Sequence, residues 1–125
     1  MPRKRTPVLT DAELRLMTVL WDLGAATVHE VLEALPRNRR PAYNSILTTM
    51  RILEQKGYLG RDKQGRSHVY RPLISRGQAR RQALRHMVSS MFDNSPELLL
   101  VSLLENKQLT PDEVETLKKM VDDNT

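Results

Sequence analysis

Residues 41–72 place a helix directly before a β-hairpin, and basic side chains lie along both. From residue 42 the chain reads AYNSILTTMRILEQKGYLGRDKQGRSHVYRP. An amphipathic helix ends at Lys56-Gly57, and two short strands follow, one on each side of a turn at Gly65. This order of elements predicts a mainly α fold with a small β-hairpin wing, that is, a winged helix-turn-helix.

Helix starts are marked by one recurring device, a Thr followed three residues later by a Glu, as in a capping box. It occurs at Thr10, at Thr27 and at Thr110. Together with apolar periodicity it predicts helices over about residues 11–23, 28–35, 42–56, 76–92, 96–105 and 111–122. Strands are predicted over about 58–62 and 67–71, and residues 36–41 form a loop because prolines bracket them.

The helix over 42–56 has two unlike faces. Spacings of three and four predict a buried stripe of Tyr43, Ile46, Leu47, Met50 and Leu53. Short amide and hydroxyl groups on the other face would let the helix enter a major groove, where arginine can pair with guanine. We therefore predict DNA base contacts from Asn44, Ser45, Thr48 and Arg51. The alternative is a solvated polar face.

Charge divides unevenly along the chain. Residues 1–76 carry 14 Lys and Arg against 7 Asp and Glu, a balance of +7, whereas residues 77–125 carry 6 against 8, a balance of −2. A basic half joined to a mildly acidic half predicts a polyanion-binding unit with a different role at the other end. Ordinary surface solubility would also explain the charge, which does not distinguish DNA from RNA or lipid.

Cations flank the helix over 42–56 on both sides. Arg39 and Arg40 precede it, and Lys63, Arg66 and His68 lie on the hairpin. We predict that these five side chains contact the DNA backbone, which gives affinity and salt dependence but no choice of sequence. Charges at a hairpin tip can also serve only to protect a sheet edge from aggregation.

The region after residue 74 predicts association. Residues 98–104 read LLLVSLL, so this helix is apolar nearly all the way round and must be buried, although the region is too small to bury it alone. We predict a DNA-binding domain over 1–74 and a helical dimerisation domain over 75–125 that forms a two-fold homodimer. The predicted dimerisation residues are Leu84, Met87, Met91, Leu99, Leu100, Leu103, Leu104, Leu117 and Val121. The alternative is a monomer that packs this region onto the helix over 11–23.

Other chemistry is weakly represented. There is no cysteine, and the three histidines are scattered, so we predict no metal and no cofactor. No serine has a neighbouring base and no glycine-rich phosphate loop occurs, so we predict no enzyme. Trp21 is predicted to be a core residue rather than a ligand platform. No stretch approaches the ~20 apolar residues of a membrane span, so we expect a cytoplasmic protein with no membrane partner.

The run from Leu9 to Val121 resembles the winged-helix repressors of penicillinase and methicillin-resistance operons, the BlaI/MecI/CopY type. The matching pieces are LTDAELRLMTVLW, TVHEVLEAL, AYNSILTTMRILEQKGYL, GRSHVYRP and LTPDEVETL. The resemblance implies a homodimer that binds a palindromic operator near a promoter and represses transcription. It also implies DNA contacts from the recognition helix and the wing, at Asn44, Ser45, Thr48, Arg51, Arg66 and His68.

The chain departs from this family's pattern in two places. In the β-lactam-responsive members, a membrane sensor-protease system triggers cleavage at an Asn-Phe bond, where this chain has Ser102-Leu103. The resemblance thus names a regulatory protease as a candidate partner, with Ser102 and Leu103 as its site, although the residue types differ. The cysteine-rich metal site of copper-responsive members is excluded here.

Two other classes of function stay open at this point. One is a protein-interaction module built on the winged fold, and the other is a non-specific architectural DNA binder. The exposed polar face of the helix over 42–56 favours base reading over the latter.

Overall fold

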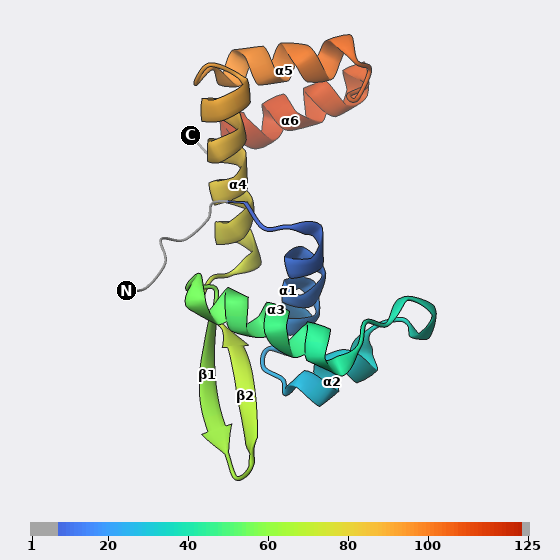
Figure 1. Ribbon diagram of the computed structural model, residues 1–125. Coiled ribbons are helices and arrows are strands. Elements are labelled where there is room, and N and C mark those ends of the chain that lie inside the picture. Colours follow the sequence, from blue (N-terminus) through green and yellow to red (C-terminus); the bar gives the residue numbers. More distant parts are fainter. Residues whose placement is uncertain (1–7, 124–125) are drawn as a thin grey trace. The chain divides into compact units, whose positions relative to one another are not determined.

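The computed structural model describes residues 8–123, apart from the side chain of Val121. Six α-helices, one 3₁₀ turn and two strands follow one another in this range (Figure 1). Their bounds are α1 Asp11–Leu23, α2 Val28–Ala34, the 3₁₀ turn Arg37–Arg39, α3 Tyr43–Gln55, β1 Leu59–Gln64, β2 Ser67–Pro72, α4 Arg76–Met91, α5 Pro96–Glu105 and α6 Pro111–Asp123. The chain forms two compact units, one up to Leu84 and one from Arg85 onward.

The predicted mainly α fold with a hairpin wing is confirmed, and the differences from it are local. The hairpin extends further toward its tip than predicted, because a two-residue turn of Gly65 and Arg66 lets Gln64 pair with Ser67. Gly65 has a φ of +59°, which suits a glycine at the first central position of a type II′ turn. The predicted loop at 36–41 contains a 3₁₀ turn, closed by the Arg39 N–H on the Pro36 carbonyl at 3.2 Å.

The predicted capping boxes form at all three helix starts. At α1, for example, the Thr10 hydroxyl accepts from the Glu13 N–H at 3.1 Å, and Glu13 Oε1 accepts from the Thr10 N–H at 2.9 Å. The sequence analysis missed a fourth box at α4, where Ser75 and Gln78 exchange the same two bonds. Its Ser-x-x-Gln spacing is the signal that could have revealed it.

The end of α3 is fixed by a Schellman motif. The Gly57 N–H donates to the Glu54 carbonyl at 3.1 Å, and the Tyr58 N–H donates to the Leu53 carbonyl at 3.0 Å. Gly57 has a φ of +87°, the left-handed conformation that this motif requires and that glycine adopts without strain. Leu53 and Tyr58 are both buried, as the hydrophobic contact of such a motif demands. The chain therefore leaves α3 for β1 in one defined direction.

The core lies in the first unit, between α1, α2, α3 and the base of the hairpin. Its fully buried side chains include Met17, Leu20, Val31, Ile46, Met50, Leu53, Tyr58, Leu59 and Tyr70. The stripe predicted on α3 is confirmed at Ile46, Met50 and Leu53. It is wrong at Tyr43, which is 47% exposed because it occupies the first position of α3, where the stripe runs past the core.

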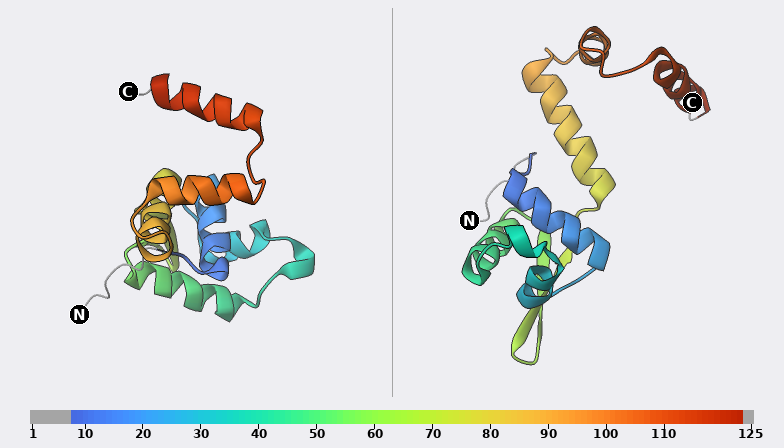
Figure 2. Two further views of the ribbon diagram at one scale, coloured as in Figure 1. Left: turned by 90° about the horizontal axis from the view of Figure 1, so that it is seen from above. Right: turned by 90° about the vertical axis from the view of Figure 1, so that its right-hand side faces the viewer.

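A third, very short strand pairing joins the hairpin to the helices. The Ala26 N–H donates to the Tyr70 carbonyl at 2.9 Å, and the Tyr70 N–H donates to the Ala26 carbonyl at 2.8 Å. Both residues are buried. In Figures 1 and 2 the hairpin accordingly projects from the helical body, with its turn directed away from α1, α2 and α3.

The second unit contrasts with the first. Neither α4 nor α5 contains a buried residue, although α5 is the most apolar of the described helices. The large apolar side chains exposed along these helices and α6 are Leu84, Met87, Met91, Leu98, Leu100, Val101, Leu104, Leu117 and Met120. Among the described helices, none combines the length and the apolar character needed to cross a membrane.

One buried ion pair ties the start of α1 to the end of α3. Lys56 Nζ lies 2.7 Å from Glu13 Oε2, and Glu13 is only 4% exposed. Burial acts to raise the pKa of the Glu13 carboxyl, but the bonds from Lys56 and Thr10 and the Lys56 charge outweigh it. The pKa of Glu13 therefore lies below its ordinary value of 4.5.

We predict that Glu13→Gln removes a pH-dependent part of the stability. Because the folded-state pKa is lowered, the pair stabilises fully above about pH 4.5, and its contribution disappears as the pH falls through the folded-state value. At pH 7 the variant should lose about 1–3 kcal/mol of unfolding free energy, with a smaller difference from wild type in acid. Urea unfolding over a pH series measures this, with Glu33→Gln as an exposed control. Parallel wild-type and Glu13→Gln curves would contradict the assignment.

Candidate nucleic-acid interface

The exposed face of α3 presents the predicted base-contacting residues together. At about 100° per residue, Thr48 lies about 40° from Asn44 around the helix and Arg51 about 20° on its other side. Ser45 lies at the edge of this face, about 100° from Asn44. All four side chains are exposed. The face therefore offers an amide, two hydroxyls and a guanidinium, with no carboxylate among them.

The hydroxyl of Thr48 is partly committed within the helix. It donates to the Asn44 carbonyl at 2.9 Å, so the oxygen keeps its lone pairs as acceptors and the methyl group stays exposed. These groups suit an amino donor or a thymine methyl in a major groove. Asn44 supplies both a donor and an acceptor, and Arg51 has no hydrogen bond or ion pair to any other described residue.

The start of α3 differs from the starts of the other α-helices described. Its N-cap is Ala42, which makes no side-chain hydrogen bond, whereas side-chain caps occupy the starts of α1, α2, α4, α5 and α6. The Ser45 N–H donates to the Ala42 carbonyl at 3.0 Å, so the N–H groups of Tyr43 and Asn44 are left for an external acceptor at the positive end of the helix dipole. A backbone phosphate beside the groove would satisfy them.

The arginines before α3 have different roles. Arg39 is exposed and has no ion pair or hydrogen bond from its side chain in the described structure. Arg40 is half-buried, and its Nη2 donates to the carbonyls of Glu33 at 3.2 Å and Leu35 at 2.9 Å. Leu35 is the C-cap of α2, so Arg40 satisfies carbonyls that the end of that helix leaves open. Its side chain holds the loop in place.

The cations of the hairpin also fall into two groups. Arg71 Nε lies 2.9 Å from Asp62 Oδ2, and Arg61 Nε lies 3.4 Å from Glu54 Oε2. Lys63, Arg66 and His68 are exposed and have no such partner in the part of the chain that the structure describes. The tip of the hairpin therefore carries the unpaired positive charges of Lys63 and Arg66, while charges nearer its base are neutralised.

This sorting follows from the strand register. Asp62 is opposite Val69, so Arg71 is its diagonal neighbour on the same face, within reach of a long side chain. The sequence analysis predicted the wing cations without separating the paired from the free ones, because the register depends on the exact turn. In the described chain, free cations lie before α3, on it and beyond it, as a surface for a polyanion requires.

A metal centre finds no support in this geometry. The described residues hold no group of three or more His, Cys, Asp or Glu side chains placed to bind a metal ion. His29 pairs with Glu33 at 3.7 Å on an exposed helix face, as adjacent turns commonly do.

Comparison with known proteins places this surface in context. A family model described as penicillinase repressor matches residues 9–123. The penicillinase repressor of Bacillus licheniformis is 26% identical over 121 residues, which cover 97% of this chain and 94% of that protein. The methicillin resistance regulatory protein MecI of Staphylococcus aureus is 20% identical over 117 residues, covering 94% of this chain and 95% of MecI.

Solved structures agree with the fold of the first unit. The DNA-binding domain of the repressor BlaI is 33% identical, with a TM-score of 0.54, and covers 61% of this chain and 93% of that one. The monomeric form of Bacillus licheniformis BlaI, in complex with the blaP half-operator, is also 33% identical, with a TM-score of 0.50 and the same coverage.

We predict that Arg40→Ala destabilises the first unit. Two carbonyls at the end of α2 would lose their donor, at a cost of about 1–2 kcal/mol in unfolding free energy. Arg39→Ala is the matched control, and it should stay within about 0.5 kcal/mol of wild type because its side chain is free. Urea unfolding of both variants measures the difference. Equal stabilities would show that Arg40 does not hold the loop.

Proposed function

This chain belongs to the penicillinase repressor family and is a DNA-binding transcriptional repressor, and from this premise we propose that it acts as a homodimer on an inverted-repeat operator. Bound near a promoter, the dimer would block polymerase by occupying the site. Its place of action would be the cytoplasm, where bacterial DNA is accessible. The family is one of repressors rather than enzymes.

The observation that carries this proposal is the exposed face of α3. Asn44, Ser45, Thr48 and Arg51 would read base edges in the major groove, with Arg51 suited to guanine. The uncapped N–H groups at the start of α3 would bind a phosphate at the groove edge. Base reading of this kind gives selection of sequence, which a non-specific architectural binder lacks.

Phosphate contacts are assigned to the free cations on both sides of α3. We assign Arg39 to one flank, and Lys63, Arg66 and His68 on the wing to the other. We place Arg40, also predicted to contact the backbone, behind this surface as the residue that orients the loop. Each phosphate neutralised would add affinity that falls with salt.

We assign dimerisation to the region after residue 74. We therefore propose 1–74 and 75–125 as the two functional domains. Apolar side chains such as Met91, at 74% exposure, and Leu104, at 42%, are only partly covered by the described residues of one chain. A second copy would cover Leu84, Met87, Leu99, Leu100, Leu103 and Leu117 as well. Val121 belongs to the same predicted set, but its side chain lies outside the described residues.

Two-fold symmetry sets the form of the operator. Each protomer would bind one half-site, so the half-sites would be inverted and about one helical turn or a multiple apart. The BlaI relative was solved as a monomer on a half-operator. One protomer of the present chain would use α3 and the wing on each half in the same way.

A regulatory protease stays a candidate partner. Ser102 and Leu103 are half-buried in the second half of α5, and the Ser102 hydroxyl donates to the Leu98 carbonyl at 2.9 Å. A protease binds its substrate extended, so cleavage at this bond would require α5 to unwind locally. We propose that dissociation of the dimer would have to precede such a cut.

We predict that Arg51→Ala and Arg66→Ala weaken DNA binding in different ways. Arg51→Ala should weaken binding to the operator by ~1–3 kcal/mol and leave random DNA nearly unaffected. Arg66→Ala should weaken binding to both and reduce the salt slope by about one per protomer. Fluorescence anisotropy on upstream fragments of the protein's own gene, over a salt series with random competitor, measures both effects.

The matched control is the double variant Asp62→Asn/Arg71→Ala, because it removes both members of an ion pair on the same wing and leaves the net charge of the wing unchanged. It should change neither affinity nor salt slope appreciably. A footprint on the selected fragment should show two inverted halves. If Arg51→Ala weakened binding equally for all sequences, Arg51 would be a phosphate contact. If random competitor removed the wild-type protein equally from every fragment, operator recognition would be ruled out.

We also predict that Leu104→Glu dissociates the dimer. A carboxylate placed among apolar side chains would be buried without a partner, which costs several kcal/mol. Sedimentation equilibrium should give a dimer for wild type and a monomer for the variant, while circular dichroism of the first unit persists. Glu105→Gln, at the neighbouring exposed position, is the control. A wild type that sediments as a monomer would contradict the proposal.

A further inference from the structure

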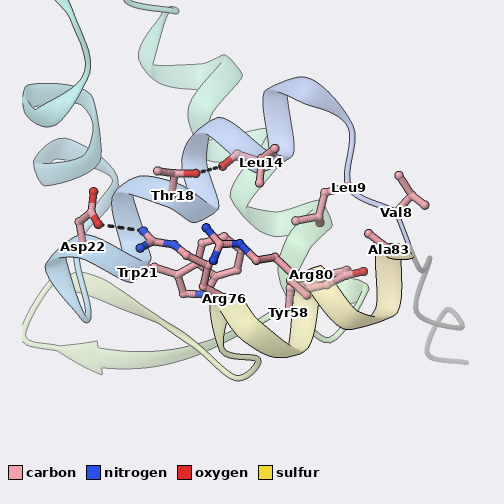
Figure 3. Close-up of a pocket in the computed structure, with 11 residues that line it drawn as sticks. Val8, Leu9, Leu14, Thr18, Trp21, Asp22, Tyr58, Arg76, Arg80 and Ala83 are labelled. Carbon is pink, nitrogen blue, oxygen red and sulfur yellow. Dashed lines mark hydrogen bonds and ion pairs between the residues drawn. The ribbon is translucent and has the colours of Figure 1, made fainter. Parts of the chain in front are cut away.

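The first unit contains a pocket that DNA binding does not use. Its volume is about 650 Å³, within the range of small-molecule sites. It lies between α1 with the preceding residues Val8 and Leu9, the residue Tyr58 after α3, and the first half of α4 (Figure 3). None of its residues lies on the exposed face of α3 or on the wing, so a ligand here would leave the DNA-binding surface free.

The walls of the pocket are mainly apolar. Leu9 and Leu14 line it from the α1 side, Ala83 from α4, and the rings of Trp21 and Tyr58 complete the lining. Leu14 is 46% exposed and Val8, which also lines the pocket, is 42% exposed. A molecule bound against these two side chains would therefore remove apolar surface from water.

The opening of the pocket carries a net positive charge. Arg76 Nη2 lies 2.8 Å from Asp22 Oδ1, and its guanidinium lies 5.5 Å from the centre of the Trp21 ring. Arg80, one turn further along α4, has no ion pair or hydrogen bond to the rest of the described chain. Figure 3 shows both arginine side chains extending from α4 toward α1. The two guanidinium groups and the one carboxylate together carry a net charge of +1.

Trp21 therefore has a role in this pocket in addition to the predicted role of a core residue. Its Nε1 donates to the Ile74 carbonyl at 2.9 Å, which fixes the ring, while part of the ring stays accessible and lines the pocket. Because it is the only tryptophan of the chain, its fluorescence and its single indole N–H resonance report on this site alone.

We propose that this pocket binds an organic monoanion with an apolar body, such as an arylalkanoate. The body packs against Leu9, Leu14 and Trp21, and the carboxylate pairs with Arg80, whose charge has no partner in the described part of the chain. Among the described residues that line the pocket, a second anionic group finds no second free cation, because Arg76 is neutralised by Asp22. The ligand bridges α1 and the first half of α4 within the first unit.

The test uses phenylbutyrate and its neutral counterpart phenylbutanol on the full chain. Phenylbutyrate should shift the Trp21 fluorescence and indole resonance saturably, with a dissociation constant on the order of 1 mM for a ligand of this size. Phenylbutanol should bind about three- to tenfold more weakly, because it forms no charge-assisted bond to Arg80. Neither compound absorbs where tryptophan is excited at the red edge of its band, so the fluorescence change reports binding.

Neighbouring arginines of α4 supply matched variants. Arg80→Ala should abolish the preference for the anion, whereas Arg81→Ala, which alters an arginine that does not line the pocket, should retain it. Equal affinities of wild type and Arg80→Ala for phenylbutyrate would overturn the proposal. So would the absence of saturation by either compound. If the Trp21 signal changed with protein concentration but not with either compound, the pocket would be a contact for a second copy of the chain. That result would also overturn the proposal.

Discussion

The two backbone hydrogen bonds between Ala26 and Tyr70 set the geometry on which the DNA-facing surface depends. They anchor β2 to the segment between α1 and α2, and the hairpin register then fixes every other wing residue. A shift by one residue would turn Tyr70 out of the core and exchange the faces of Lys63 and Asp62. The Schellman motif at Gly57 makes the second attachment, so the direction in which the chain leaves α3 for the wing is also fixed.

Much of the first unit could be predicted because its signals are local. The capping boxes place helix starts to the residue, since the Thr and Glu that form them are three positions apart and need no distant partner. Gly57 and Gly65 mark the end of α3 and the hairpin turn for the same reason. The exposed polar face of α3 follows from its periodicity alone. These features place the candidate site before any tertiary contact is known.

The remainder of the site depends on contacts between distant residues. Arg39 and Arg40 are neighbours of the same type, yet only Arg40 reaches the carbonyls at the end of α2, and no sequence pattern distinguishes them. The neutralised Arg71 and the free Arg66 differ only through strand register. The pocket beside Trp21 is likewise assembled from α1, Tyr58 and α4, so periodicity along one helix predicts a core residue there.

The two units differ in what their folding requires, and this has a consequence for control. The first unit completes its core within one chain, whereas the second exposes most of its apolar residues, which we propose a second copy covers. Loss of the second unit's order would therefore leave α3 and the wing folded. In the proposed dimer it would still weaken operator binding, because two linked half-site contacts would become two independent ones. A repressor built this way can be released from DNA by a change confined to its C-terminal helices, without unfolding the surface that reads the sequence.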